Sequence, residues 1–579
     1  QVLLDPNTLS PDGSVSVHGI FPSRDGRLLA YKLSVNNADA STLHLRDLDS
    51  GRELPDKIDN ARYANPSWTP DGRGFYYVWV PPVGPGVPIA DRPGFAELRF
   101  HALGTDAAKD PTIRDANHDP QTFLVGELSA DGRWLFATVE HGWSSTDLYY
   151  MDLRAPRRAW RALIEHADAN YRVTAFRDRF YVYTNDGAPR YRVLVVDPAQ
   201  PARAAWRELI AERDDTLDAA AVIGGRLVLT YLHDATSRLE LVELTGKPVR
   251  ALPLPPLVAV GGVIGRATDK VAYVTFTSFT EPRTIVQLDA ATGALSPWGK
   301  IALPIDTSAI VAEQVRFAST DGTTVPMFLV HHKDATPDGD RPVYLTGYGG
   351  FNVSAQPGFV SSRSSWAAHA VWIEHGGVVA IPNLRGGGEY GETWHQAGMR
   401  QHKQQVFDDF LSAARWLIDH KWTRAGRLAI AGGSNGGLLV GAAVTQAPEL
   451  FRAVVCEVPL LDMVRYHLFG SGKTWIAEYG SADDPDDLAA LYAYSPYHRV
   501  RAGARYPAVL LSSSDHDDRV DPMHARKLAA ALQWATAGDA PILLRIQRNA
   551  GHGGSDQVRQ KIDQNADTYA FLMAQLGMR

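Results

Sequence analysis

The sequence has little cysteine and no long apolar run. Among its 579 residues Cys456 is the one cysteine, which excludes an intramolecular disulfide and a cysteine-rich zinc site. Its place in the apolar run AVVCEV is typical of a buried strand residue. No apolar stretch approaches the roughly 20 residues that a membrane-spanning helix needs. The opening residues, QVLLDPNTLS, lack the charged and apolar regions of a signal peptide.

The sequence also lacks an excess of positive charge. Its 58 basic and 65 acidic residues give a net charge of -7, which offers no reason to expect a nucleic acid or an anionic membrane as a partner. We expect no metal and no other cofactor. The chain begins with Gln1 and not with Met, so it is processed or incomplete. We assign it to the cytoplasm, with the periplasm or secretion as the alternative.

A chain of this length is too long for one ordinary hydrophobic core, so two domains are expected. In residues 1–303, an Asp-Gly type of turn followed by a short β-rich run recurs at intervals of about 44 to 60 residues, as in the blades of a β-propeller. A generic β-sandwich is the alternative. The turns contain Asp25, Asp71, Asp131, Asp178, Gly225 and Asp269.

Residues 304–579 show a different pattern, in which short apolar runs alternate with helical stretches. One helical face is formed by Val406, Phe407, Phe410, Leu411, Ala414, Leu417 and Ile418. This alternation predicts a doubly wound, mostly parallel sheet with sites beyond the carboxyl ends of its strands. The predicted strands are 343–347, 377–383, 427–433, 452–458, 508–514 and 542–547.

Two glycine-rich stretches resemble nucleotide sites. In FGSGKTWIAEYG, a Walker motif would need glycine where His467 stands, and no strand leads into the stretch. In RGGGEYG, Gly386, Gly388 and Gly391 satisfy G-x-G-x-x-G, but a lone fingerprint is weak. We therefore interpret the second stretch as a loop that needs close backbone packing.

A third motif, GGSNG, fits G-x-S-x-G around Ser434, with an apolar strand before it and a small-residue helix after it. A serine on such a sharp strand-to-helix turn is partnered in chain order by an aspartate and a histidine. Strand 508–514 is followed by Asp515, Asp517 and Asp518, and strand 542–547 is followed by His552. This order predicts a serine hydrolase of the α/β-hydrolase type, with the choice of aspartate open.

At these residues the sequence resembles the prolyl oligopeptidase family over nearly its whole length. Related peptidases that cut after basic residues more often have alanine after the nucleophile, so Asn435 favours the proline-specific branch. The stretches that carry the resemblance are GYGGFNVS (347–354), NLRGGGEYGETWH (383–395), GGSNGGLL (432–439), TWIAEYG (474–480), DHDDRVDPMHA (515–525) and AGHGG (550–554).

The resemblance implies roles for individual residues. It implies Ser434 as nucleophile, His552 as general base and Asp517 as the carboxylate that orients the imidazole. It also implies an oxyanion hole made by the Tyr348 hydroxyl and the backbone N–H of Asn435. Trp475 would lie flat on a proline ring, and Arg519 would hold a substrate carbonyl. The pocket is completed by Phe351, Leu460, Tyr479 and Val520.

We therefore expect an α/β-hydrolase domain at 304–579 and an N-terminal β-propeller at 1–303 that caps the site and screens out large folded substrates. The expected activity is cleavage of short peptides after proline by a monomeric serine endopeptidase, through an acyl-enzyme intermediate. A basic-residue oligopeptidase or acylaminoacyl peptidase is the alternative on the same scaffold, and a non-catalytic propeller interaction protein is the alternative from another class. Six repeats are visible, so a first blade can be missing upstream.

Overall fold

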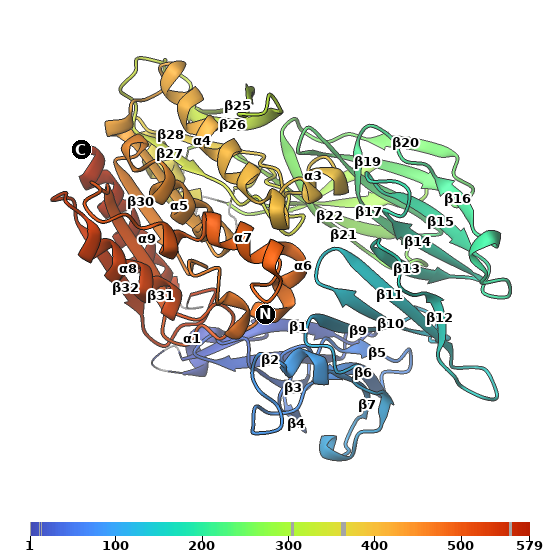
Figure 1. Ribbon diagram of the computed structural model, residues 1–579. Coiled ribbons are helices and arrows are strands. Elements are labelled where there is room, and N and C mark those ends of the chain that lie inside the picture. Colours follow the sequence, from blue (N-terminus) through green and yellow to red (C-terminus); the bar gives the residue numbers. More distant parts are fainter. Residues whose placement is uncertain are drawn as a thin grey trace.

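The computed structural model describes residues 2–10, 12, 14–302, 306–359, 366–554 and 558–578. A group of small sheets in the N-terminal half lies beside a helix-covered sheet in the C-terminal half (Figure 1). The last strand of the first group, β24, ends at Lys300, and the next strand, β25, begins at Ile310. The boundary predicted between residues 303 and 304 lies outside the described residues.

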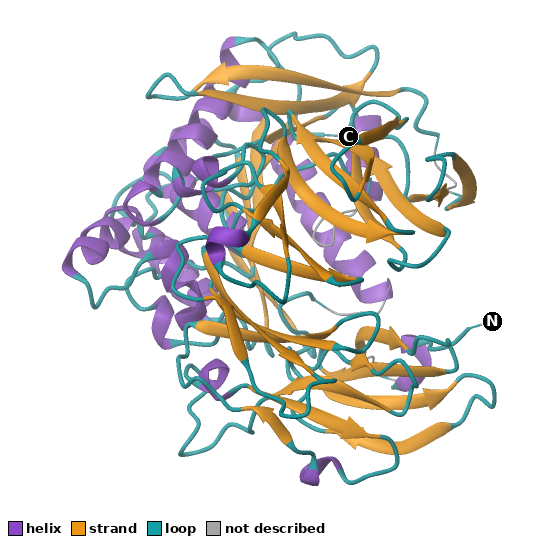
Figure 2. Cartoon of the chain, turned by 90° about the vertical axis from the view of Figure 1, so that its right-hand side faces the viewer, coloured by secondary structure: helices purple, strands orange, loops and turns teal. Residues whose placement is uncertain are grey.

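The described N-terminal residues form six antiparallel sheets of four strands each, preceded by a short helix, α1 (Pro6–Leu9). Figure 2, with strands in orange, shows the sheets as successive groups. The strands are β1 (Val15–Pro22), β2 (Leu28–Val35), β3 (Thr42–Asp47), β4 (Glu53–Ile58); β5 (Ser67–Trp68), β6 (Gly74–Trp79), β7 (Glu97–Ala102), β8 (Thr112–Arg114); β9 (Thr122–Leu128), β10 (Trp134–His141), β11 (Ser145–Asp152), β12 (Arg161–Ile164); β13 (Tyr171–Phe176), β14 (Arg179–Thr184), β15 (Arg192–Val196), β16 (Arg207–Ile210); β17 (Thr216–Ile223), β18 (Arg226–His233), β19 (Thr236–Glu243), β20 (Pro248–Leu252); and β21 (Val258–Ile264), β22 (Val271–Ser278), β23 (Thr284–Asp289), β24 (Leu295–Lys300).

The six predicted turns each lie between the first and second strands of one sheet. In the first sheet the hydroxyl of Ser23 donates to the carboxylate of Asp25, and Gly26 takes a φ of 73°, which favours glycine. The same hydroxyl–carboxylate pair recurs at Thr69 with Asp71 and at Ser129 with Asp131. The repeats therefore mark one blade each, and the propeller prediction is confirmed.

Apolar side chains fill the space between successive blades. Trp134 and Tyr150 of the third blade pack edge-on against Phe180 of the fourth, at ring-centroid distances of 5.0 and 5.4 Å for the two pairs with Phe180. Because the two faces of a blade are covered by its neighbours, inner strands such as β6 and β18 carry long runs of buried residues, whereas the outer strands β20 and β24 are largely exposed.

The C-terminal half contains an eight-stranded sheet in the order β25-β26-β28-β27-β29-β30-β31-β32. The six strands β28-β27-β29-β30-β31-β32 are parallel to one another, and β25 and β26 run antiparallel at one edge. All six predicted strands are present. The bounds are β25 (Ile310–Ala318), β26 (Thr324–His332), β27 (Val343–Thr346), β28 (Val378–Pro382), β29 (Leu428–Gly433), β30 (Ala453–Glu457), β31 (Ala508–Ser514) and β32 (Ile542–Gln547).

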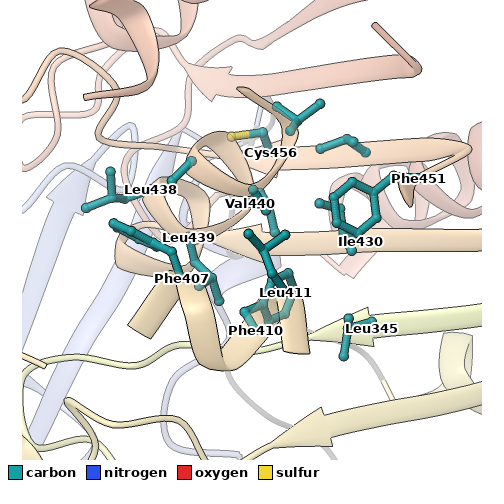
Figure 3. Packing of buried hydrophobic residues seen from close by; sticks show 14 of the residues in the cluster. Leu345, Phe407, Phe410, Leu411, Ile430, Leu438, Leu439, Val440, Phe451 and Cys456 are labelled. Atoms are coloured by element: carbon teal, nitrogen blue, oxygen red, sulfur yellow. The ribbon is translucent and has the colours of Figure 1, made fainter. Parts of the chain in front are cut away.

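Helices cover both faces of this sheet. On β29, Ile430 belongs to the core shared with α4, α5 and α8, whereas Ala431 belongs to the core shared with α2 and α9. Figure 3 shows Phe407, Phe410 and Leu411 of α4 beside Leu438, Leu439 and Val440 of α5. The helices are α2 (Trp366–Glu374), α3 (Glu392–Gln396), α4 (Gln404–Asp419), α5 (Asn435–Gln446), α6 (Ile476–Tyr479), α7 (Pro485–Tyr494), α8 (Met523–Ala535) and α9 (Val558–Leu576).

The fold is that of an α/β-hydrolase, as predicted. Its parallel strands end at one common edge, and β29, β31 and β32 are followed there by Ser434, Asp517 and His552. In the part of the chain that the structure describes, no helix combines the length and the apolarity needed to cross a membrane.

Candidate active site

Ser434 occupies a strained turn between β29 and α5. Its φ of 59° is rare for a residue with a side chain. A Cβ at Gly432 would overlap the carbonyl of Gly436, and one at Gly437 would lie 2.6 Å from the Cβ of Pro459. Glycines on both sides of the serine are therefore needed for the backbone to turn here.

The loops after β31 and β32 join an aspartate to a histidine. Asp517 Oδ2 lies 2.8 Å from His552 Nδ1, and both side chains are buried. Asp517 Oδ1 accepts hydrogen bonds from the backbone N–H of Arg519 and Val520, which fix the carboxylate. His552 Nε2 is buried with no hydrogen-bond partner among the described residues, so it is free to accept a proton.

The other two aspartates of this loop are engaged elsewhere. Asp515 lies 2.7 Å from the ring of its neighbour His516, and Asp518 accepts from the backbone N–H of Asp39 in the first blade. Of the three carboxylates left open by sequence spacing, Asp517 is thus the one that contacts His552. Ser434 follows β29, two strands from β31 in the same sheet.

A cavity of about 520 Å³ lies in front of Ser434, between the two domains. Predicted residues that line it are Tyr348, Phe351, Leu460, Trp475, Tyr479 and Arg519. Val520 is buried in the hydrophobic core that also contains Phe351, Leu460, Trp475 and Tyr479, but it does not line the cavity. The propeller contributes lining residues that the sequence did not indicate, namely His18, Lys32, Asp39, Arg62, Tyr63, Phe123 and Trp143.

Aromatic rings give one end of the cavity apolar walls. Phe351 lies edge-on to Tyr479, with centroids 5.4 Å apart, and Trp143 of the third blade lies edge-on to Phe351 at 4.7 Å. Trp475 is 8% exposed and ends the short helical turn Gly472–Trp475. The preceding Lys473 pairs with Asp91 of the propeller, so its ammonium is already neutralised.

The side chain of Asn435, just after the serine, connects the turn to two other parts of the site. Its Nδ2 donates to the carbonyl of Tyr348 at 2.6 Å, and its Oδ1 accepts from the hydroxyl of Tyr479 at 2.8 Å. The backbone N–H of Asn435 begins α5, where amide groups point outward and can bind an anion. Sequence reasoning assigned a role to this N–H and missed the side chain.

Arg519 is anchored across the domain interface. Its Nε and Nη2 donate to Asp39 at 2.9 and 2.7 Å, and Arg62 also donates to Asp39, at 2.8 Å. Burial alone would raise the pKa of Asp39, but the two guanidinium groups hold that pKa at about 2. The second terminal nitrogen of Arg519, Nη1, makes none of these contacts and is left to bind another acceptor.

The RGGGEYG loop packs tightly instead of enclosing a ligand. A Cβ at Gly388 would lie 2.6 Å from the carbonyl oxygen of Asn352, and a Cβ at Gly391 would overlap the carbonyl of Pro189 in the propeller. Gly391 also has a φ of 82°. The glycines allow backbone contact on two sides, as the interpretation as a packing loop predicts.

These features together define a serine hydrolase of the α/β-hydrolase class whose cavity is closed by a β-propeller. Comparison with known families specifies the class further. The prolyl oligopeptidase N-terminal β-propeller domain matches residues 1–300, and the prolyl oligopeptidase family matches residues 363–579. The chain belongs to the prolyl oligopeptidase family of serine peptidases.

Individual relatives match this chain over nearly its whole length. A prolyl endopeptidase of Elizabethkingia miricola is 34% identical over 581 residues, which cover 100% of this chain and 81% of the relative. A structure from a study of two prolyl endopeptidases is 50% identical, with a TM-score of 0.96, and the match covers 100% of this chain and 84% of the other. Prolyl oligopeptidase B of Galerina marginata, bound to a macrocyclization substrate, is 29% identical with a TM-score of 0.92, over 99% and 82% of the two chains.

Proposed function

We propose that this protein is a serine endopeptidase that cleaves short peptides on the C-terminal side of proline. The observation that carries the proposal is the apolar slot of Trp475, Phe351 and Tyr479, which opens beside Ser434 in the same cavity. The slot suits a flat, uncharged ring. Membership of the prolyl oligopeptidase family supports the same substrate class.

The proposed chemistry proceeds in two halves. Ser434 Oγ attacks the carbonyl carbon of the proline residue. At the same time His552 Nε2 takes the hydroxyl proton of Ser434, and Asp517 stabilises the resulting imidazolium. His552 then returns the proton to the leaving amine, which gives an acyl-enzyme. A water molecule, deprotonated by His552, attacks the ester, and His552 passes that proton to Ser434 Oγ as the acid is released. The Tyr348 hydroxyl and the Asn435 N–H donate to the oxyanion in both halves.

Substrate selection follows from the two ends of the cavity. Burying the three ring methylenes of proline contributes about 0.8 kcal/mol each, or roughly 2.4 kcal/mol of preference, which corresponds to a factor of about 60. Nη1 of Arg519 can donate to the carbonyl of the residue before proline. The rings of Tyr63, Phe123 and Trp143 offer apolar contact to residues further from the scissile bond.

The charge of the cavity argues against cleavage after basic residues. Among the described lining residues Asp39 is the one carboxylate, and it is already paired with Arg519 and Arg62. A substrate arginine would meet no free negative charge there. Matched chromogenic substrates with proline or arginine before the scissile bond test this proposal, and faster cleavage of the arginine substrate would refute it.

We further propose that the chain acts as a monomer in the cytoplasm, without a nucleic acid partner, and that the propeller excludes large folded substrates. Light scattering tests the monomer, and a comparison of a peptide with a folded protein that contains exposed proline tests the exclusion. A fluorophosphonate probe separates the enzyme from a non-catalytic interaction protein, because only an activated serine takes up the label.

A further inference from the structure

The segment Tyr348–Asn352, here called the oxyanion loop, has an unusual backbone. Gly349, Phe351 and Asn352 have φ values of 62°, 60° and 57°. For residues other than glycine, this left-handed region costs on the order of 1 kcal/mol each. The loop carries the Tyr348 hydroxyl, whose position relative to Ser434 matters for the proposed reaction. Other parts of the protein must therefore hold it in place.

Two buried ionic side chains hold the loop by its backbone. The ammonium group of Lys403, just before α4, donates to the carbonyl of Gly349 at 2.8 Å. Glu478 Oε1, from α6, accepts the backbone N–H of Phe351 at 2.9 Å. Lys403 Nζ and Glu478 Oε1 are 3.8 Å apart, with 1% and 0% of their side chains exposed. The carbonyl of Tyr348 is bound separately by Asn435.

The pair belongs to a larger buried network of balanced charge. His395 in α3 lies 2.8 Å from Glu478 and 3.1 Å from Glu392. Burial disfavours the charged form of His395, but the two carboxylates more than offset it and raise the pKa to about 9. Asn185 of the fourth blade donates to Glu392, so the network reaches the propeller.

Stability is a poor explanation for such a network. Removing four charged groups from water costs several kcal/mol each, and well-packed apolar replacements of a buried ion pair are often neutral or stabilising. What an apolar core lacks is a directed donor for the Gly349 carbonyl and a directed acceptor for the Phe351 N–H. The two ionic groups supply these in a fixed geometry.

Glu478 is also next to a residue of the proline slot in the chain. It lies in α6 beside Tyr479 and three residues after Trp475, so one carboxylate connects the slot to the oxyanion loop. Tyr479 in turn donates to Asn435, next to the nucleophile. The slot, the loop and the serine turn are thus joined through Glu478, Lys403 and Asn435.

We propose that Lys403 and Glu478 are positioning residues that hold the Tyr348 hydroxyl and the proline slot at the correct distance from Ser434. This inference rests on the proposed function of the site. Neither side chain lines the substrate cavity, so each acts through another residue. Removing Lys403 should weaken transition-state binding more than substrate binding, because its hydrogen bond goes to the oxyanion loop, whereas its contact with the slot is the weaker one of its ammonium over the Tyr479 ring, 5.3 Å from the centroid.

The first experiment measures kcat and KM of Lys403→Met on a proline substrate, per active site titrated with fluorophosphonate. Loss of one oxyanion donor typically costs about 100- to 1000-fold in kcat, and we expect about 10- to 100-fold for a displaced donor, with KM changed less than about threefold. Glu478→Gln should lower kcat and also raise KM, since Glu478 directly precedes Tyr479 of the slot in α6. Unchanged kcat per titrated site in both variants would overturn the proposal.

The second experiment is a double-mutant cycle with Tyr348→Phe. If Lys403 acts through the Tyr348 hydroxyl, the double variant Tyr348→Phe/Lys403→Met is no slower than Tyr348→Phe alone. Losses in kcat that multiply would overturn the proposal. Lys527→Met is the matched control. Lys527 lies in α8 and also pairs with a buried carboxylate, that of Asp462, and no contact with the oxyanion loop is present among the described residues. This control should leave kcat per site unchanged.

Two further measures keep the test decisive. If Lys403→Met does not fold, Lys403→Gln takes its place: its side chain is shorter and uncharged but keeps a donor for Gly349, so kcat per titrated site should fall by less than the roughly 10- to 100-fold expected for Met, and an unchanged kcat would overturn the proposal. If the wild type does not prefer proline, the cycle can be repeated on the rate of fluorophosphonate labelling. A failed substrate assignment and a failed positioning role therefore give different results.

Discussion

The carboxyl group of Glu389, in the RGGGEYG loop, should make the protein less stable as the pH rises. The side chain is buried, and its Oε1 accepts from the backbone N–H of Ala355 and from Asn383 Nδ2, at 2.7 and 3.2 Å. Its Oε2 has no hydrogen-bond partner among the described residues. Burial raises the pKa of this carboxyl group from 4.5 to about 7, against the opposing effect of the hydrogen bonds.

The sign and size of the effect follow from this pKa. The folded state binds the Glu389 proton more tightly than the unfolded state does. The contribution of this group to the free energy of unfolding is therefore fully present below about pH 4.5 and is lost as the pH rises to about 7. At about 1.4 kcal/mol per pH unit, the loss amounts to roughly 3 kcal/mol. Glu389→Gln is neutral at every pH and should not show it.

The assay is urea unfolding of the wild type and of Glu389→Gln between pH 4.5 and 8.5, followed by tryptophan fluorescence. The variant should gain about 3 kcal/mol of apparent stability relative to the wild type over this range. Glu449→Gln, at an exposed glutamate of the same domain, is the control and should show no such trend. A stability difference between Glu389→Gln and wild type that does not change with pH would refute the reasoning.

Three further predictions concern the site. Ser434→Ala should abolish both peptide cleavage and fluorophosphonate labelling, and residual labelling would point to another nucleophile. Trp475→Ala should reduce the preference for proline over alanine before the scissile bond by about 10- to 60-fold in kcat/KM, since about 2 kcal/mol of ring contact is lost; an unchanged ratio would exclude Trp475 from the slot. Gly551→Ala should lower kcat at least about tenfold, because its Cβ would overlap the carbonyl of Asn37 in the first blade and displace the loop of His552; full activity would mean that this contact can relax.

Local patterns predicted much of the fold because each is set by neighbouring residues. The Asp-Gly turns depend on a hydroxyl, a carboxylate and a glycine within a few positions, and the parallel strands depend on short apolar runs. Ser434 and His552 could be proposed as partners because both were expected to follow strands of one sheet, and the structure places them after β29 and β32. The patterns that predicted the turns and strands involve neighbouring residues, and the structure contains the predicted turns and strands.

The rest of the site depends on contacts between distant segments. Spacing could not separate Asp517 from Asp515 and Asp518, because the choice depends on which carboxylate meets the imidazole. Lys403 and Glu478 are ordinary charged residues in the sequence, and only folding makes them buried partners of the oxyanion loop. The cavity wall formed by Trp143 could not be foreseen, since an aromatic residue near a hairpin is common in any β domain.

The cavity between the domains has a consequence for how selectivity can change. Ser434, His552 and Asp517 come from the sheet domain, whereas Tyr63, Phe123 and Trp143 come from propeller blades that bear none of the three. We therefore expect substitutions at the blade positions to alter which flanking residues of a peptide are accepted and to leave the proposed hydrolytic residues unchanged. The proline slot stays with Ser434 in the sheet domain, so we expect exchange of blade loops to change the preference for flanking residues and not the preference for proline.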